Sequence, residues 1–218
     1  MNKFRSVILG LALTFGGTTA AQAVTITNGN FESGPAVGGG GFTTIDSGTA
    51  LTGWNVTDGG IDYIGSYWTG QAGAGSHSID LNGNSAGAIS QTLNGLTAGV
   101  TYVVSFFISG NPDNGQQPNP KQATLLLGNS SNPVSYTLTA VNSSSSMNWQ
   151  RVSYSFLASG ATALLALTST TPGAYGLAVD NFSISAAPDA ATWLTMILGF
   201  GLVGAAMRRR PTFTRATA

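Results

Sequence analysis

The chain contains no cysteine and one histidine, and only 7% of its 218 residues are charged. The lack of cysteine excludes disulfides, a Cys nucleophile and thiolate-bound metal. Because His77 is the only histidine, a multi-His zinc site is excluded, and any Ser-His-Asp triad would depend on that residue. We therefore expect no catalytic residues and interpret His77 as a turn or surface side chain.

The charged residues are unevenly distributed along the chain. Residues 24–187 contain seven acidic side chains, but Lys121 and Arg151 are their only cations. Nucleic-acid-binding domains carry clustered cations that neutralise phosphates. We therefore expect no nucleic-acid partner.

The N-terminus has the pattern of an export signal. Lys3 and Arg5 precede an apolar run at 7–15, and small residues then lead to Ala21 and Ala23 around Gln22. A basic start, an apolar run and an A-x-A ending are typical of a cleaved signal peptide. The sequence predicts a signal peptide at 1–23.

The C-terminus has a second apolar segment. Residues 190–207 carry no charge and are mostly apolar, and Arg208, Arg209 and Arg210 follow. This length and the basic end predict a transmembrane helix with residues 211–218 as a cytoplasmic tail. The alternative is a buried C-terminal helix of a globular domain.

The segment 188–210 also resembles a PEP-CTERM sorting signal of the type with a tryptophan after the motif. The similarity rests on Pro188 and Asp189, on Thr192-Trp193, and on the run ILGFGLVGAAMRRR at 197–210. Here Pro188-Asp189-Ala190 stands in place of the family's Pro-Glu-Pro. The resemblance implies an exosortase-type processing enzyme as a partner, with Pro188, Asp189, Trp193 and the three arginines as the sorting residues.

Residues 24–187 have a length that suits one domain. Apolar residues alternate with polar ones in segments such as 101–109, 134–139 and 150–156, a period of two that is typical of half-buried strands. The other expected strands lie at 51–56, 61–64, 77–81, 87–93, 121–127, 161–168 and 178–184. Many short strands separated by Gly, Asn and Pro predict an all-β fold, an antiparallel jelly-roll β-sandwich.

Two acidic residues are candidates for a metal site. Counting by two along the last expected strand places Asp180 on the face of Phe182 and Ile184, toward the core. A buried carboxylate needs a counter-charge or several hydrogen-bond donors, and oxygen ligands favour Ca²⁺. The alternative is that Asp180 hydrogen-bonds the neighbouring backbone.

Several motifs of the domain together resemble the choice-of-anchor C family of exported bacterial proteins. They are ITNGNFESG at 26–34, IDYIGSYW at 61–68, HSIDLNGNSAGAISQTL at 77–93, TYVVSFFISGNP at 101–112 and AYGLAVDNFSIS at 174–185. The resemblance implies a galactose-binding-like jelly roll that is distantly similar to carbohydrate-binding modules. It also implies a structural Ca²⁺ held by Glu32 and Asp180, with Asn28 as a weaker candidate.

Aromatic residues in Gly-rich loops are candidates for sugar binding. Tyr67 and Trp68 lie in GSYWTGQAGAGSH, and Tyr175 lies in STTPGAYG. Aromatic faces pack on the apolar faces of sugars, while amides and carboxylates pair with hydroxyls. The candidates for polar contacts are Gln71, Asn82 and Asn84. The alternative is that Trp68 packs at the edge of the sandwich.

These observations favour an exported, non-enzymatic envelope or extracellular-matrix protein that binds exopolysaccharide. One alternative is a structural surface protein that acts through protein–protein contacts. The other is a glycan-active enzyme that uses Asp62 and Asp80 as paired carboxylates.

Overall fold

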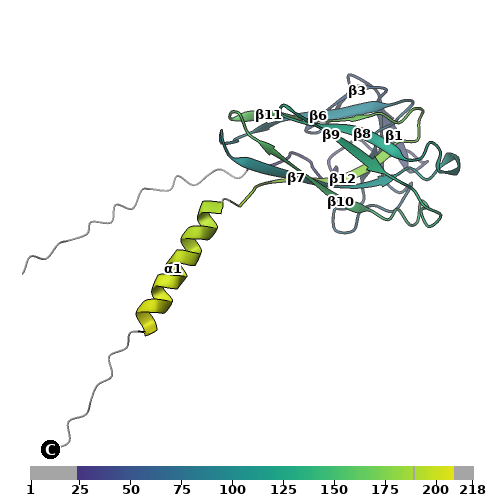
Figure 1. Cartoon of the computed structure of the whole chain (residues 1–218). Coiled ribbons are helices and arrows are strands. Elements are labelled where there is room, and N and C mark those ends of the chain that lie inside the picture. The colour runs from purple at the N-terminus through teal and green to yellow at the C-terminus, as the bar shows by residue number, and fades with distance from the viewer. Residues whose placement is uncertain (1–23, 189, 209–218) are drawn as a thin grey trace, which may run out of the picture.

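The computed structural model describes residues 24–188 and 190–208, which form a β-sandwich and a separate helix (Figure 1). The predicted signal peptide at 1–23, Asp189, Arg209, Arg210 and the tail 211–218 lie outside the described residues.

Two six-stranded sheets make up the sandwich, and every strand pairing in them is antiparallel. The first sheet has the order β1 (Phe42–Ile45), β4 (Ile61–Ile64), β5 (Ser78–Asp80), β12 (Leu177–Ala186), β7 (Thr101–Gly110) and β10 (Gln150–Leu157). The second has the order β2 (Ala50–Leu51), β3 (Trp54–Asp58), β6 (Gly87–Asn94), β11 (Thr162–Ser169), β8 (Lys121–Leu127) and β9 (Ser130–Tyr136). The predicted all-β antiparallel, jelly-roll-like sandwich is confirmed. Strand β1 was not predicted, and the segment expected as one strand at 51–56 is divided between β2 and β3.

The main core lies between the two sheets and is rich in aromatic rings. Phe106 of β7 stacks on Phe182 of β12 with centroids 4.4 Å apart, and Phe182 also contacts Trp54 and Phe31. Phe31 belongs to the segment before the first strand and is fully buried. Burial of this ring therefore holds the N-terminal segment 24–33 against the sandwich.

A bulge in β12 changes which face Asp180 occupies. Asp180 pairs with Phe107 and Ser183 pairs with Ser105, so two residues of β12 oppose the single residue Phe106. Asn181 in the bulge has φ 53°. The extra residue reverses the alternation of side chains. The prediction that Asp180 shares a face with Phe182 and Ile184 is therefore wrong: Asp180 is buried on the outer face of the first sheet.

A second, smaller core covers part of that outer face. It consists of Ile64, Trp68, Met147 and Ala178, with Phe42, Tyr67 and Trp149 packed against it. Ile64 and Ala178 come from β4 and β12, whereas Trp68 and Met147 come from loops. Two loops are thus held against the first sheet by apolar burial.

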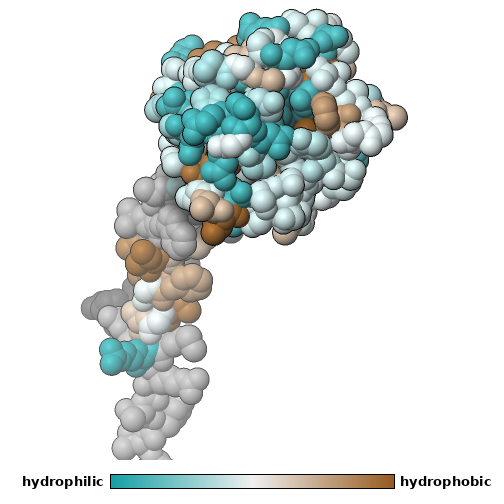
Figure 2. Space-filling view, turned by 90° about the vertical axis from the view of Figure 1, so that its right-hand side faces the viewer, coloured by the Kyte–Doolittle hydropathy of each residue, from teal (hydrophilic) through white to brown (hydrophobic). Residues whose placement is uncertain are grey.

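Helix α1 (Ala190–Arg208) lies apart from the sandwich and exposes apolar side chains (Figures 1 and 2). Phe200, for example, is 77% exposed. The expected helix is present. Among the residues that the structure describes, however, we find no helix that is both long enough and apolar enough to cross a membrane, so a membrane span at 190–207 is not confirmed.

Candidate functional site

A pocket of about 300 Å³ lies on the outer face of the first sheet, beside the smaller core. Strands β1 and β4 contribute to it, together with four loops. Its lining residues are Phe42, Thr44, Asp62, Ile64, Tyr67, Trp68, Gly83, Asn84, Asn111, Asp113, Ala174 and Tyr175. The pocket therefore combines aromatic rings with carboxylate, amide and hydroxyl groups.

Three aromatic residues predicted from the sequence meet in this pocket: Tyr67, Trp68 and Tyr175. Tyr67 is half-buried, packs edge-on against Phe42 with centroids 5.2 Å apart, and donates its hydroxyl hydrogen bond to a carboxylate oxygen of Asp113. That hydrogen bond, together with burial, raises the pKa of Tyr67 to about 12. Tyr67 thus stays a neutral phenol at physiological pH.

Trp68 is mainly a packing residue. Its side chain is 3% exposed and belongs to the smaller core. The indole Nε1 donates to Ser78 Oγ at 2.8 Å. Most of the Trp68 ring therefore packs against the sandwich, as the alternative interpretation predicted. Only a small part of the ring faces the pocket.

Two acidic residues border the pocket: Asp62, which the sequence suggested only as a carboxylate of the glycan-active alternative, and Asp113, which it did not suggest. Asp62 of β4 is half-buried and accepts a hydrogen bond from Thr44 Oγ1 at 2.6 Å. Burial raises the pKa of Asp62 above its ordinary value, and this hydrogen bond opposes the shift. Asp113 lies in the loop after β7, and only tertiary structure brings that loop beside Tyr67.

Asp80 lies beneath the pocket and organises its surroundings. It is fully buried and accepts hydrogen bonds from the backbone N–H groups of Asn82 and Gly176, both at 3.0 Å, and from Asn111 Nδ2 at 2.8 Å. Burial raises the pKa of Asp80 to about 7, and these hydrogen bonds oppose the shift. Since Asn111 lines the pocket and Gly176 follows Tyr175, Asp80 holds two of its loops in place.

Asn82, predicted to contact a sugar, does not line the pocket. Its Nδ2 donates to the carbonyl oxygens of Thr171 at 2.8 Å and Gly173 at 2.6 Å. Its Oδ1 lies so close to Gly176 that a Cβ atom added to this glycine would be 2.3 Å from the oxygen. Asn82 therefore fixes the loop that carries Tyr175, and Asn84 is the pocket residue.

Glu32, a predicted metal ligand, is tied to the loop before β5. Its carboxylate accepts the backbone N–H of Ser76 at 2.9 Å and that of His77 at 2.8 Å, and His77 Nδ1 lies 3.0 Å from its second oxygen. Burial raises the pKa of Glu32, but the hydrogen bonds from His77 and Ser76 outweigh it and hold the pKa below its ordinary value. The His77 ring stacks on Tyr63 with centroids 5.0 Å apart.

Asp180 and Gln71 form a second polar cluster. Asp180 Oδ1 accepts the N–H of Asn181 at 2.6 Å, and Gln71 Oε1 accepts from Asn181 Nδ2 at 3.3 Å. Burial raises the pKa of Asp180 to about 7, whereas the hydrogen bond from the backbone N–H of Asn181 opposes this shift. Gln71 therefore lies with Asp180 and is not among the residues that line the pocket with Tyr67 and Tyr175.

The side chains around Asp180 fit a hard cation such as Ca²⁺. Asp180 Oδ2 is buried and has no hydrogen-bond partner among the described residues, and the charge of Glu32 is close enough to raise the pKa of Asp180. Within the described ranges no group of three or more His, Cys, Asp or Glu side chains is placed to hold a metal. A cation would therefore need amide or carbonyl oxygens, such as those of Gln71, as further ligands.

Asn28, the weaker metal candidate, has a different role. Its Nδ2 donates to the carbonyl oxygens of Ser33 at 2.8 Å and Thr52 at 2.9 Å, and its Oδ1 accepts the N–H of Ser33 at 3.0 Å. These contacts close the turn that presents Phe31 and Glu32. The Asn28 side chain is thus already committed to backbone groups.

The fold and the pocket define this protein as a jelly-roll-like β-sandwich with a loop-built pocket on one outer face. The chain belongs to the DUF642 family, whose description is "protein of unknown function". Residues 24–185 match the model of this family.

The chain is also similar to halomucin of Haloquadratum walsbyi. The two are 34% identical over 188 residues, which are 84% of this chain and 2% of halomucin. This chain thus spans only a small fraction of the length of that relative.

Solved structures with a related sandwich include TmCBM61 in complex with β-1,4-galactotriose, with a TM-score of 0.48, 15% identity, and coverage of 73% of this chain and 96% of that one. Another is the CBM22-1 xylan-binding domain from Paenibacillus barcinonensis, with a TM-score of 0.43, 16% identity, and coverage of 80% and 100%. At these TM-scores the structural similarity does not identify what this chain binds.

Proposed function

We propose that this protein is a non-enzymatic carbohydrate-binding protein and that the pocket lined by Tyr67, Asn111 and Tyr175 holds a sugar unit of a polysaccharide. The observation that carries the proposal is the composition of the pocket. Half-buried aromatic rings lie beside Asp62, Asn84, Asn111 and Asp113. A pyranose has apolar C–H faces and a rim of hydroxyl groups, and such a set of side chains complements both.

The catalytic pair considered from the sequence, Asp62 and Asp80, does not lie in one site. Glycosidases place two carboxyl groups on either side of the scissile bond. Asp62 borders the pocket, but Asp80 is fully buried beneath it. The pair considered from the sequence therefore does not flank one ligand site.

The test is titration calorimetry. Neutral oligosaccharides that differ in their backbone are titrated into the purified full-length chain, and the heat of binding is measured. We expect saturable binding that is weakened about tenfold or more when Tyr175→Ala removes a ring from the pocket. Leu157→Ala is the matched control, because Leu157 is 67% exposed on β10 and does not line the pocket. Release of reducing ends would contradict the proposal, and self-assembly without glycan binding would favour a structural matrix protein.

A structural Ca²⁺ bound by Asp180 and Glu32 belongs to the same proposal. It is supported by the unpartnered buried oxygen of Asp180 and by the neighbouring charge of Glu32. Bound there, Ca²⁺ would supply the positive charge that this cluster lacks and would join the segment before the first strand to the last strand.

The proposal also extends to where the protein acts. The sequence patterns at 1–23 and 188–210 support export, processing by an exosortase-type enzyme after temporary membrane attachment, and a final place at the cell surface or in the extracellular polysaccharide. Fractionation of cells that express the full chain or a chain ending at Ala187 tests this. Retention of the truncated chain in the membrane fraction would contradict membrane attachment through 188–210.

A further inference from the structure

The charge of the pocket limits which sugars it can hold. Asp62 and Asp113 line it, and none of its lining residues in the described part of the chain is Lys, Arg or His. Hydrogen bonding to hydroxyl groups would not require this excess of negative charge, because Asn84 and Asn111 already provide amide groups. The two carboxylates therefore determine the electrostatic potential that a ligand meets.

Asp62 lacks a counter-charge. One of its carboxylate oxygens accepts from Thr44 Oγ1, and no other described residue donates a hydrogen bond to this side chain. Its cross-strand partner is another acid, Asp80. Asp62 is half-buried, so solvent screens its charge less than it screens that of an exposed side chain.

The buried cation Lys121 does not line the pocket. Lys121 of β8 is fully buried, and its Nζ donates to the carbonyl oxygen of Tyr175 at 2.9 Å. The charges that act on it are those of Asp80 and Asp113. Lys121 lies behind the loop of Tyr175 and is not among the lining residues.

We infer that the pocket selects sugar units without acidic groups and that Asp62 is the residue that determines this selection. The inference rests on the proposed carbohydrate-binding function. A uronate, sulfate or phosphate group in the pocket would be close to two carboxylates and would meet no cation among the described lining residues, and like charges in a partly desolvated site repel strongly. A uronate-rich polysaccharide is therefore excluded as the preferred ligand.

Pairs of oligosaccharides, one neutral and one acidic, test this inference on the full chain. The probes are galacto-oligosaccharide against oligogalacturonate, and fully methyl-esterified oligogalacturonate against the same oligomer with free carboxylates. We expect the neutral member of a pair to bind at least about tenfold more tightly than the acidic one. Higher ionic strength should reduce the difference, because salt screens the repulsion.

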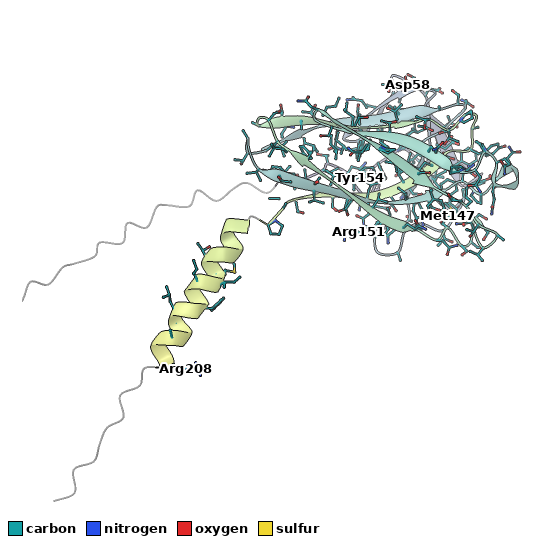
Figure 3. All side chains as sticks on the ribbon, in the orientation of Figure 1. Asp58, Met147, Arg151, Tyr154 and Arg208 are labelled. Carbon is teal, nitrogen blue, oxygen red and sulfur yellow. The ribbon has the colours of Figure 1, made fainter. Side chains whose placement is uncertain are left out.

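The variant Asp62→Asn keeps the oxygen that accepts from Thr44 and removes the charge. It should increase affinity for the acidic member severalfold relative to the neutral member, so the ratio of the two affinities is the quantity to measure. Asp58→Asn is the matched control: Asp58 is exposed at the end of β3 in the second sheet, and Figure 3 shows it on the opposite side of the sandwich from Met147 of the smaller core. This control should leave the discrimination unchanged.

The outcomes separate this inference from the proposed function. Equal binding of both members of a pair, tighter binding of the acidic member, or unchanged discrimination in Asp62→Asn overturns the inference and leaves carbohydrate binding standing. Absence of binding to every neutral and acidic oligosaccharide overturns both.

Discussion

Asp62 and Asp80 are direct cross-strand partners on β4 and β5, but only Asp62 borders the pocket, whereas Asp80 is fully buried beneath it. Like charges directly opposite each other destabilise a strand pair. Here the inner carboxylate is compensated by hydrogen bonds from Asn82, Gly176 and Asn111. One acid therefore positions the loops, and the other lines the pocket.

Replacement of Asp80 should destabilise the fold and disturb the pocket. Asp80→Asn replaces one acceptor oxygen with an N–H donor, so a buried donor in its surroundings loses its partner. We expect the free energy of unfolding to fall by about 1–3 kcal/mol, measured by urea denaturation. Asp58→Asn makes the same change at an exposed position and should alter it by less than about 0.5 kcal/mol. Equal effects of the two substitutions would contradict the role of Asp80.

Stability should decrease as the pH rises from mildly acidic to mildly alkaline. Burial raises the pKa values of Asp80 and Asp180 to about 7 in the folded protein, from about 3.9 in an unfolded chain. Proton binding therefore favours the folded state, and this contribution is complete below the unfolded pKa and is lost as the pH passes through about 7. In the presence of a chelator, the urea midpoint should be higher at about pH 5 than at about pH 8. A midpoint that rises steadily to pH 8 would refute the assignment.

Glu32 has the opposite dependence on pH. Its pKa is lowered in the folded protein, where burial, which raises it, is outweighed by hydrogen bonds from His77 and Ser76. Its contribution is present above its unfolded pKa and is lost as the pH falls through the folded value. Glu32→Gln should therefore lower stability at neutral pH and have little effect in strong acid. An equal loss of stability at both pH values would show that packing, not charge, explains the effect.

Calcium should stabilise the protein through Asp180. If Ca²⁺ binds only the folded state, a concentration of 100 times Kd adds about 2.7 kcal/mol, and thermal denaturation should show a higher Tm with Ca²⁺ than with chelator. Asp180→Asn should remove this difference, whereas the exposed Asp46 changed to Asn should preserve it. A calcium response that survives in Asp180→Asn would place the cation elsewhere.

Trp68 and Tyr175 should respond differently to replacement by alanine. Trp68 is 3% exposed within the smaller core, so Trp68→Ala should cost about 3–5 kcal/mol of stability. Tyr175 is half-buried in a loop, so Tyr175→Ala should mainly weaken glycan binding. Denaturation and calorimetry on both variants separate the two effects. A large stability loss in Tyr175→Ala would make it a packing residue.

The strand pattern was largely predictable because period-two alternation reflects burial on one side of a sheet. The expected segments 61–64 and 121–127 coincide with β4 and β8. Strand β1, Phe42–Ile45, follows a Gly-rich stretch and was not predicted. Its four residues, FTTI, show no clear alternation, and only Ile45 among them is buried, so no local pattern marks the strand.

The site was predictable only in part. Tyr67, Trp68 and Tyr175 were selected from their residue type and loop context, and all three line the pocket. Asp113 was not predicted, and Asp62 was considered only for the enzyme alternative, because a carboxylate in a strand or a polar loop has no local signal that distinguishes it from a solvated one. Gln71 and Asn82 do not line the pocket, and their sequence could not show this because amides are equally common in binding sites and in loop anchors.

The sequence by itself determined the all-β class, the poverty of catalytic side chains and the acidic balance of the domain, because these depend on composition and on local periodicity. The tertiary structure alone decided that the bulge at Asn181 places Asp180 on the outer face, and that Asp80 is buried while Asp62 remains accessible. The physical reason is that the register of a strand and the coverage of a sheet by loops depend on partners distant in the chain, which no local pattern records.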